Sequence, residues 1–214
     1  IDPSTNTIDK TVAVGPNPEE MVIVNKSLYV TNSDGNNYNA GYANGKSVSK
    51  ISLSDFVEEK KIAVGLNPTK ITADALGNVL VLCMGDYSAT PATVWKINAE
   101  DEATSMNIPA TIMDIKDNSL YVINAPYGAP SITYTVYNTS SGAVEKENFV
   151  SAPVDAPAGI AVHSDGRIFI TSYTLVGGFA SYKTPGYVSE YSSDGTFVKK
   201  YDVGVGAVSM TFLK

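Results

Sequence analysis

The sequence lacks long apolar runs, clustered positive charge and more than one histidine or cysteine. It contains no apolar run of about 18 residues, the length that a membrane-spanning helix requires, and no charged segment followed by an apolar one that would mark a signal peptide. Its 15 lysines and arginines are scattered, and 22 aspartates and glutamates give a net charge of −7. We therefore expect no transmembrane segment in this chain, and neither nucleic acid nor an anionic membrane as its main partner.

The single cysteine and the single histidine limit the chemistry of the chain. Cys83 lies in the apolar run VLVLCM, so we expect a buried structural thiol, and an internal disulfide is impossible. His163 precedes a turn in AVHSDG. Neither a Ser-His-Asp set nor a His/Cys metal cluster can be assembled around one such residue. We therefore expect no metal, no cofactor and no histidine-centred hydrolysis.

Helical periodicity is also missing, and a repeat is present instead. No segment has a convincing 3.6-residue apolar period with capping residues, although 43% of the residues are hydrophobic, which is ample for a core. GPNPEEMVIVNKSLYVTN aligns with GLNPTKITADALGNVLVLC, and Pro18 and Pro68 are 50 residues apart. SLYV occurs at 27 and again at 119, 92 residues later, which over two repeats gives a period near 46.

Each repeat predicts four short antiparallel strands. The first two are apolar, as in MVIV and LYV, and the later two alternate or become charged, as in VSKISL and VEEKKI. Asp, Asn and Gly residues, as in SDG at 164–166, form the hairpin turns between them. The expected repeats span approximately 16–62, 63–108, 109–150 and 151–203. We expect the strands of each repeat to run from a buried centre to a wet rim.

A repeated four-stranded sheet predicts an all-β fold, a β-propeller of four-stranded antiparallel blades within residues 1–214. Such sheets cannot bury both apolar faces alone, and stacking them around an axis solves this. A β-sandwich is the alternative, which the regular repetition disfavours.

Incomplete repeats flank the four complete ones. Residues 7–14 resemble a fourth strand, and 206–214 resemble a first strand that would close a ring. We expect this single-domain chain to be a fragment that lacks upstream blades, and a seven-bladed ring. A ring of five blades is the alternative if residues 7–14 complete the closing blade, and a ring of six to eight blades is expected if further repeats precede Ile1.

Tyr29-Val30-Thr31-Asn32 spells YVTN, and the linker V-A-V-G-P-N-P at 12–18 follows I-D-P-S-T-N. These motifs resemble the YVTN family of bacterial and archaeal surface β-propellers. The match covers the whole chain, although VLC at 81–83, YVIN at 121–124 and FITS at 169–172 depart from the signature. The long loops look most like surface lipoprotein propellers of Bacteroides-type bacteria, which include BtuG-type proteins that capture corrinoids. The resemblance implies a cell-surface or periplasmic location in a Gram-negative bacterium.

The connections between second and third strands are the candidate binding elements. They span 33–46, 84–92, 124–131 and 172–186, far longer than the hairpin turns, and loops longer than about 12 residues are usually functional or disordered. Rigid aromatics beside adjustable polar groups form binding surfaces for bulky, partly apolar ligands or for proteins. The candidate ligand-binding residues are Asp34, Asn36, Asn37, Tyr38, Tyr42, Asp86, Tyr87, Tyr127, Tyr173, Phe179 and Tyr182.

Loop carboxylates leave a hydrolase as an alternative. Asp34, Asp86, Asp114 and Asp155 lie in or near loops and could pair as a glycosidase acid and base. SSDGTF at 192–197 resembles a sialidase Asp-box, but its glycine directly follows the aspartate, and we interpret it as a turn. DGNNYN at 34–39 is an incomplete calcium loop, because Tyr38 interrupts the oxygen ligands.

Three hypotheses follow from these observations. The first is a non-enzymatic surface or periplasmic propeller that binds a small molecule, with a corrinoid such as vitamin B12 as the first guess. The second is a scaffold that docks to an outer-membrane protein. The third is a propeller glycosidase or lactonase.

Overall fold

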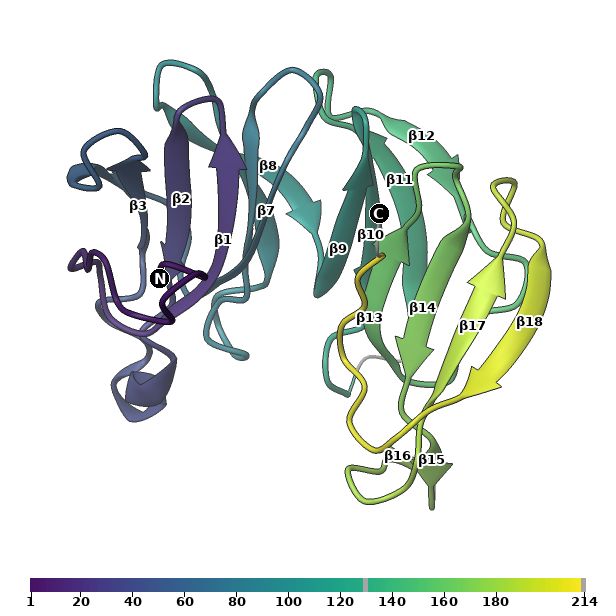
Figure 1. Ribbon diagram of the computed structural model, residues 1–214. Coiled ribbons are helices and arrows are strands. Elements are labelled where there is room, and N and C mark those ends of the chain that lie inside the picture. Colours follow the sequence, from purple (N-terminus) through teal and green to yellow (C-terminus); the bar gives the residue numbers. More distant parts are fainter. Residues whose placement is uncertain (129–130, 213–214) are drawn as a thin grey trace. The chain divides into compact units, whose positions relative to one another are not determined.

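The computed structural model describes residues 1–128 and 131–212. The chain forms two compact units, Ile1–Pro109 and the chain from Ala110 onward, and each contains two four-stranded antiparallel sheets (Figure 1). The prediction of an all-β fold with four-stranded antiparallel blades is confirmed. Among the described residues, the 3-10 segment η1 (Gly35–Ala40) is the only helical element, and no helix there is long and apolar enough to span a membrane.

The first unit contains two sheets whose strands pair in chain order. Their strands are β1 (Pro18–Val24), β2 (Ser27–Asn32), β3 (Ser47–Ser52) and β4 (Glu58–Ala63), then β5 (Pro68–Ala73), β6 (Val79–Cys83), β7 (Thr93–Ile97) and β8 (Ala103–Pro109). The two sheets meet through their first strands, since β1 lies against β5.

The second unit repeats this arrangement with one insertion. Its strands are β9 (Ile112–Lys116), β10 (Ser119–Asn124), β11 (Thr133–Asn138) and β12 (Val144–Glu147), then β13 (Pro157–Val162), β14 (Ile168–Ser172), β17 (Tyr187–Tyr191) and β18 (Phe197–Asp202). β13 lies against β9. A small hairpin, β15 (Leu175–Val176) and β16 (Phe179–Ala180), is inserted between β14 and β17.

The repeated G-x-N-P linker fixes where each loop of the first unit begins. Asn17 and Asn67 both have a left-handed backbone, with φ of 50° and 57°, a conformation that asparagine tolerates better than most residues. The Asn17 carbonyl accepts a hydrogen bond from the Ser33 N–H, and the Asn67 carbonyl accepts one from the Met84 N–H. Each linker therefore ties the start of a first strand to the end of a second strand.

Burial is highest in middle strands of the sheets, namely the second strand β6 and the third strand β17, and not in the first strands as the sequence suggested. Every residue of β6 is buried, whereas Met21 and Ile23 of β1 are 65% and 62% exposed. The outer strands β12 and β18 are fully exposed, so the expected wet rim is present. The expected buried centre therefore lies in middle strands and not in the first strand, because burial depends on what packs against each face of a strand, and Met21 and Ile23 of β1 are left exposed.

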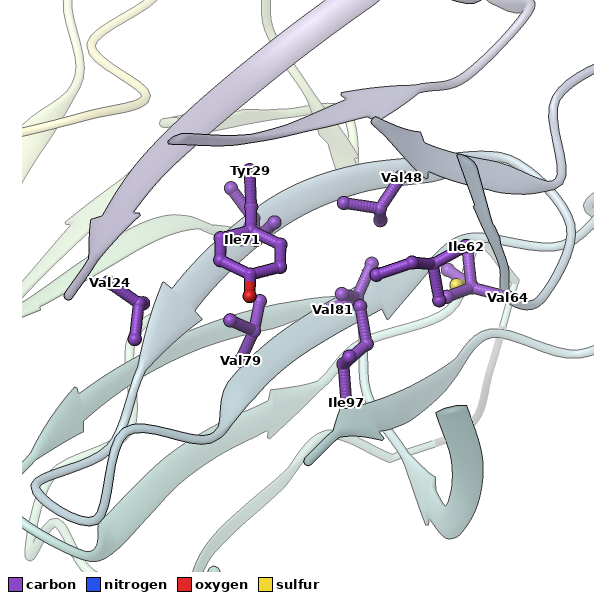
Figure 2. Packing of buried hydrophobic residues seen from close by; sticks show 10 residues of the cluster. Val24, Tyr29, Val48, Ile62, Val64, Ile71, Val79, Val81 and Ile97 are labelled. Carbon is purple, nitrogen blue, oxygen red and sulfur yellow. The ribbon is translucent and has the colours of Figure 1, made fainter. Parts of the chain in front are cut away.

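Side chains from both sheets of the first unit form one core. Val48 of β3 and Ile62 of β4 meet Val79 and Val81 of β6, with Ile97 on the far side (Figure 2). These β-branched residues suit pleated, half-buried surfaces. The core therefore joins the two sheets face to face.

Phe149, between β12 and β13, is the centre of the second core. It is 1% exposed, and its ring makes edge contacts with Tyr121 at 5.3 Å and Tyr134 at 5.8 Å between centroids. The cluster also includes Ile168 and Ile170 of β14. Aromatic pairs in this geometry contribute beyond their buried area, so Phe149 joins the two sheets of this unit.

The chain ends do not form the partial-blade strands that the repeat suggested within the described residues. In residues 7–14 the only pairing is an isolated bridge between Asp2 and Thr7. Residues 207–212 form no strand, yet they run along the second unit: Gly159 approaches the Val208 carbonyl, and the Phe212 ring lies 4.7 Å from His163. Residues 213 and 214 of the expected closing strand lie outside the described residues. The seven-bladed ring stays a prediction.

Cys83 is expected to resist alkylation in the folded protein. The thiol is buried in the first core, and burial raises its pKa to about 12. Since the thiolate is the reactive form, iodoacetamide at about pH 8 should leave the native protein unmodified and label it once in denaturant. Mass spectrometry distinguishes these states, and rapid native labelling would contradict the burial of this side chain.

Candidate functional site

The long connections leave the ends of second strands, as the sequence predicted. In the first unit, 33–46 joins β2 to β3 and 84–92 joins β6 to β7. In the second, the connection after β10 includes residues 129 and 130, which lie outside the described residues, and 173–186 joins β14 to β17. These loops contain every candidate ligand-binding residue.

Asp34 holds the first loop closed. It is buried, and its Oδ2 accepts hydrogen bonds from the Asn44 N–H at 2.9 Å and from the Asn37 side chain at 3.2 Å. The loop between them contains η1, which is kinked at Asn37, and its residues Asn36 and Tyr38 are exposed. Asp34 and Asn37 therefore form the framework, and Tyr38 lies in solvent.

Asp86 likewise holds the second loop closed. Its Oδ1 accepts hydrogen bonds from the Ser88 N–H at 2.9 Å and the Thr90 N–H at 2.8 Å. These bonds, chiefly that from Thr90, lower the pKa of Asp86 because they favour the ionised carboxylate. The loop is thus a closed turn with Tyr87 at its surface.

Tyr42 and Tyr87 bring the two loops together. Their ring centroids are 6.2 Å apart with planes at 61°, an edge-to-face contact. Both residues have φ of 57°, a left-handed conformation that is a genuine outlier for a bulky side chain. Such strain costs about 1–3 kcal/mol and clusters at ligand clamps and active sites. The two strained tyrosines therefore make a fixed aromatic pair.

Asn67 positions both tyrosines, although it is not among the predicted site residues. Its N–H donates to the Gly45 carbonyl at 2.7 Å, and Gly45 in turn donates to the Tyr42 carbonyl at 2.8 Å. Burial of the Tyr87 hydroxyl raises the pKa of this phenol, and a hydrogen bond with the Asn67 side chain lowers it by less. Tyr87 remains 65% exposed, so its ring is accessible while its hydroxyl is held. The second G-x-N-P linker could have signalled this residue.

The second unit has a separate aromatic group. Tyr173 and Tyr182 contact each other edge to face at 5.0 Å, and burial raises the pKa of Tyr173. Phe179, in the β16 strand, is 71% exposed. Tyr127 is 96% exposed, and none of these aromatic contacts includes it. The candidate aromatic residues thus form one contacting pair in each unit, Tyr42–Tyr87 and Tyr173–Tyr182.

The four candidate carboxylates all accept hydrogen bonds that stabilise the fold. Asp34 and Asp86 close their own loops. Asp114 Oδ2 in β9 accepts from the Val162 N–H of β13 at 2.7 Å, and Asp155 Oδ2 accepts from the Tyr187 hydroxyl at 3.0 Å. In the first unit, Glu20 of β1 likewise accepts from the Ile71 N–H of β5 at 3.3 Å and pairs with Lys70. Glu20 and Asp114 therefore join first strands of neighbouring sheets.

His163 lies beside a hairpin turn. The Arg167 N–H donates to Asp165 Oδ1 at 3.0 Å, and His163 Nδ1 lies 2.8 Å from the same oxygen. These two contacts, together with the Arg167 side chain, hold the pKa of Asp165 well below its usual range. No group of three His, Cys, Asp or Glu side chains within residues 1–128 and 131–212 could hold a metal ion. The Asp165 carboxylate thus stabilises the hairpin turn.

Solved structures similar to this chain share its fold. No protein-family model and no curated protein match it. Hydrazine synthase from Kuenenia stuttgartiensis aligns with a TM-score of 0.66 and 17% identity over 97% of this chain and 60% of that one. A gluconolactonase-like protein aligns with a TM-score of 0.55 and 10% identity over 90% of this chain and 64% of that one. A TolB-like protein from Agrobacterium tumefaciens aligns with a TM-score of 0.55 and 11% identity over 86% of this chain and 64% of that one.

These likenesses establish the fold and leave the activity open. The chain spans less than two thirds of the length of each of the three structures. At identities below one in five, similarity extends to the backbone and not to the site. The chain has the four-stranded antiparallel sheets of β-propeller proteins, a fold shared by enzymes and by other proteins.

Proposed function

We propose that this protein is a non-enzymatic binding propeller that captures a bulky, partly apolar ligand on the aromatic loops of its first unit. The supporting observation is the Tyr42–Tyr87 pair, in which two residues with left-handed backbones present touching rings. Aromatic side chains contribute large contact area at low entropic cost. Because the two rings are already fixed before binding, the protein loses less conformational entropy when it binds the ligand.

The chemistry of the loops favours a ligand with an apolar body and a polar rim. Tyr38 lies in the same loop as Tyr42 and is exposed, and the neighbouring amides of Asn36 and Asn39 are also exposed. Amides can both donate and accept hydrogen bonds. A corrinoid, a flat ring with amide side chains, combines these features and is the first ligand to test. A cell-surface or periplasmic location belongs to this proposal and rests on the family resemblance.

Calorimetric titration with cyanocobalamin tests the proposal. The wild-type protein should release or absorb heat at micromolar ligand. Tyr42→Ala and Tyr87→Ala should each weaken binding about 30-fold or more, because central aromatic contacts dominate binding energies. Leu76→Ala, in the β5–β6 hairpin turn, is the control and should bind as the wild type.

Two outcomes would contradict the proposal in different ways. No heat with the wild type would remove the corrinoid and leave the aromatic pair as a site for another ligand. Binding that survives both tyrosine substitutions would place the site elsewhere.

A hydrolase is a second candidate, favoured by the similarity to a gluconolactonase-like structure. It predicts turnover of a lactone or an aryl glycoside that depends on a carboxylate. Substitution of Asp34 or Asp86 by asparagine should then abolish turnover, whereas a binding protein shows no turnover to abolish. A colorimetric assay with both substrate classes decides between the candidates.

A further inference from the structure

The β15–β16 hairpin is a preformed projection. Leu175 pairs with Ala180 and Val176 with Phe179 across a turn of Gly177 and Gly178, whose φ values are 62° and 85°. Two successive positive φ angles define a type I′ turn, which suits tight hairpins. A side chain added at either glycine would meet nothing within 4 Å. In Figure 1 the hairpin extends beyond the ends of β14 and β17.

The base of the hairpin is anchored by polar contacts. The Ser181 N–H donates to the Thr174 carbonyl at 2.9 Å, and the Thr174 hydroxyl donates to the Pro185 carbonyl at 2.8 Å. The Ser181 hydroxyl donates to Thr184 at 2.8 Å. Together with the Tyr173–Tyr182 contact, these bonds hold the hairpin in one conformation, so its tip needs no ordering when it docks.

Both faces of this hairpin are apolar and exposed. Val176 and Phe179 are opposite each other on one face and are 58% and 71% exposed, and Leu175 on the other face is 40% exposed. A hairpin that covers a core is apolar and buried on one face only, because side chains alternate along a strand. Packing within the chain therefore does not explain why apolar side chains stand at positions 176 and 179, where they are exposed.

The charge of this segment differs from that of the whole chain. Residues 173–186 contain no Asp or Glu and one Lys, Lys183, in a chain whose net charge is −7. Tyr182 and Lys183 are both exposed and follow the apolar tip. Tyrosine is enriched where a membrane meets water, and lysine can extend its amine to that level while its stem stays in apolar surroundings.

We propose that the hairpin inserts its tip into the surface of an electrically neutral lipid bilayer, with Phe179 and Val176 in the outer hydrocarbon and Tyr182 and Lys183 at the headgroups. Three or four apolar side chains are too few for a stable dimer, which needs roughly 800 Å² from each partner. A single basic residue is too little for electrostatic binding to anionic lipid, which uses clusters of them. The lipid surface is the partner that fits both limits.

Insertion must be shallow, because the hairpin has two strands and therefore two unpaired edges. Unpaired N–H and C=O groups are costly in hydrocarbon, whereas the interfacial region within about 5–10 Å of the boundary contains water and polar headgroups. The tip side chains reach the hydrocarbon while the backbone edges stay hydrated. The contact is consequently weak and reversible.

Sedimentation of the full chain with phosphatidylcholine vesicles tests the proposal. The wild-type protein should sediment with vesicles at millimolar lipid. Phe179→Asp should lower its partition coefficient about 10-fold or more, because a charged group replaces the largest apolar side chain of the tip, the one that the proposal places in the hydrocarbon. Val144→Asp is the matched control, since Val144 is also exposed but lies in the outer strand β12. Its partition coefficient should equal that of the wild type.

A fluorescent variant tests the depth of insertion. Phe179→Trp adds one indole to the single native Trp95, so wild-type emission serves as the blank. Its emission should shift to the blue with vesicles and be quenched by lipids brominated near the headgroup end of the acyl chain. Equal sedimentation of Phe179→Asp and Val144→Asp, no sedimentation of the wild type, or no quenching would each overturn the proposal. Unchanged urea midpoints confirm that the variants are folded.

Discussion

Phe149→Ala is expected to lower the free energy of unfolding by about 3–5 kcal/mol, the range for truncating a buried aromatic side chain. The ring is 1% exposed and contacts Tyr121 and Tyr134 edge to face. Removing it takes away apolar burial and both aromatic contacts, and it leaves a cavity between the two sheets of the second unit. Urea unfolding followed by circular dichroism measures the change as a lower midpoint.

Phe179→Ala is the matched control for this prediction. It makes the same chemical change in the same unit, but Phe179 is 71% exposed. Its unfolding free energy should stay within about 0.5 kcal/mol of the wild type, as for surface substitutions away from special features. Equal losses from both variants would mean that Phe149 is not the centre of this core.

Much of the fold was predictable because the repeat is written into local sequence. SLYV at 27 and at 119 begins β2 and β10, and VSKISL matches β3 to within one residue at each end. Alternating or apolar runs bounded by turn residues specify strands without reference to the rest of the chain. Strand order followed because short hairpin turns make consecutive strands neighbours.

The burial of each strand was not predictable from hydropathy alone. MVIV in β1 is as apolar as VLVLC in β6, yet Met21 and Ile23 are exposed and all of β6 is buried. Burial depends on what packs against each face, which is a property of neighbouring sheets and not of the strand. The composition of a segment identifies a strand but not the elements that pack against its faces.

The candidate site was predictable as a set of loops but not as an arrangement. Tyr42 and Tyr87 are 45 residues apart in the sequence, and their contact depends on two left-handed backbones and on the Asn67 bridge. Asp34 and Asp86 looked like ligand-binding groups, but they close their own loops. A short carboxylate in a glycine-rich loop stabilises turns as readily as it binds ligands, so residue type alone could not separate these roles.

The β15–β16 hairpin was not among the predicted strands, although its sequence contains a local signal. Leu-Val and Phe-Ala flank Gly177-Gly178, and two apolar pairs around Gly-Gly favour a two-residue hairpin turn. The segment was interpreted as one long loop because strands of two residues fall below the usual length. The exposed tip, and with it the proposed lipid contact, became visible only with the pairing.

Gly195→Ala is expected to destabilise the second unit by about 2–5 kcal/mol. A left-handed backbone costs alanine about 1–2 kcal/mol, and Gly195 has φ of 90°. The added Cβ would also lie 1.9 Å from the Phe149 carbonyl oxygen, so the β17–β18 turn must move away, at a further cost of about 1–3 kcal/mol. This movement would break the 2.8 Å hydrogen bond from the Ser151 N–H to the Gly195 carbonyl. Urea unfolding again measures the loss.

Gly142→Ala separates the two contributions, because Gly142 lies in the β11–β12 turn with φ of 71° and nothing within 4 Å of its added Cβ. It should cost about 1–2 kcal/mol, the backbone part alone. The excess loss in Gly195→Ala then measures how tightly the turn of one sheet packs on the other. Equal losses would show that the turn can move freely. In that case the Phe149 side chain, and not the turn, would hold the sheets together.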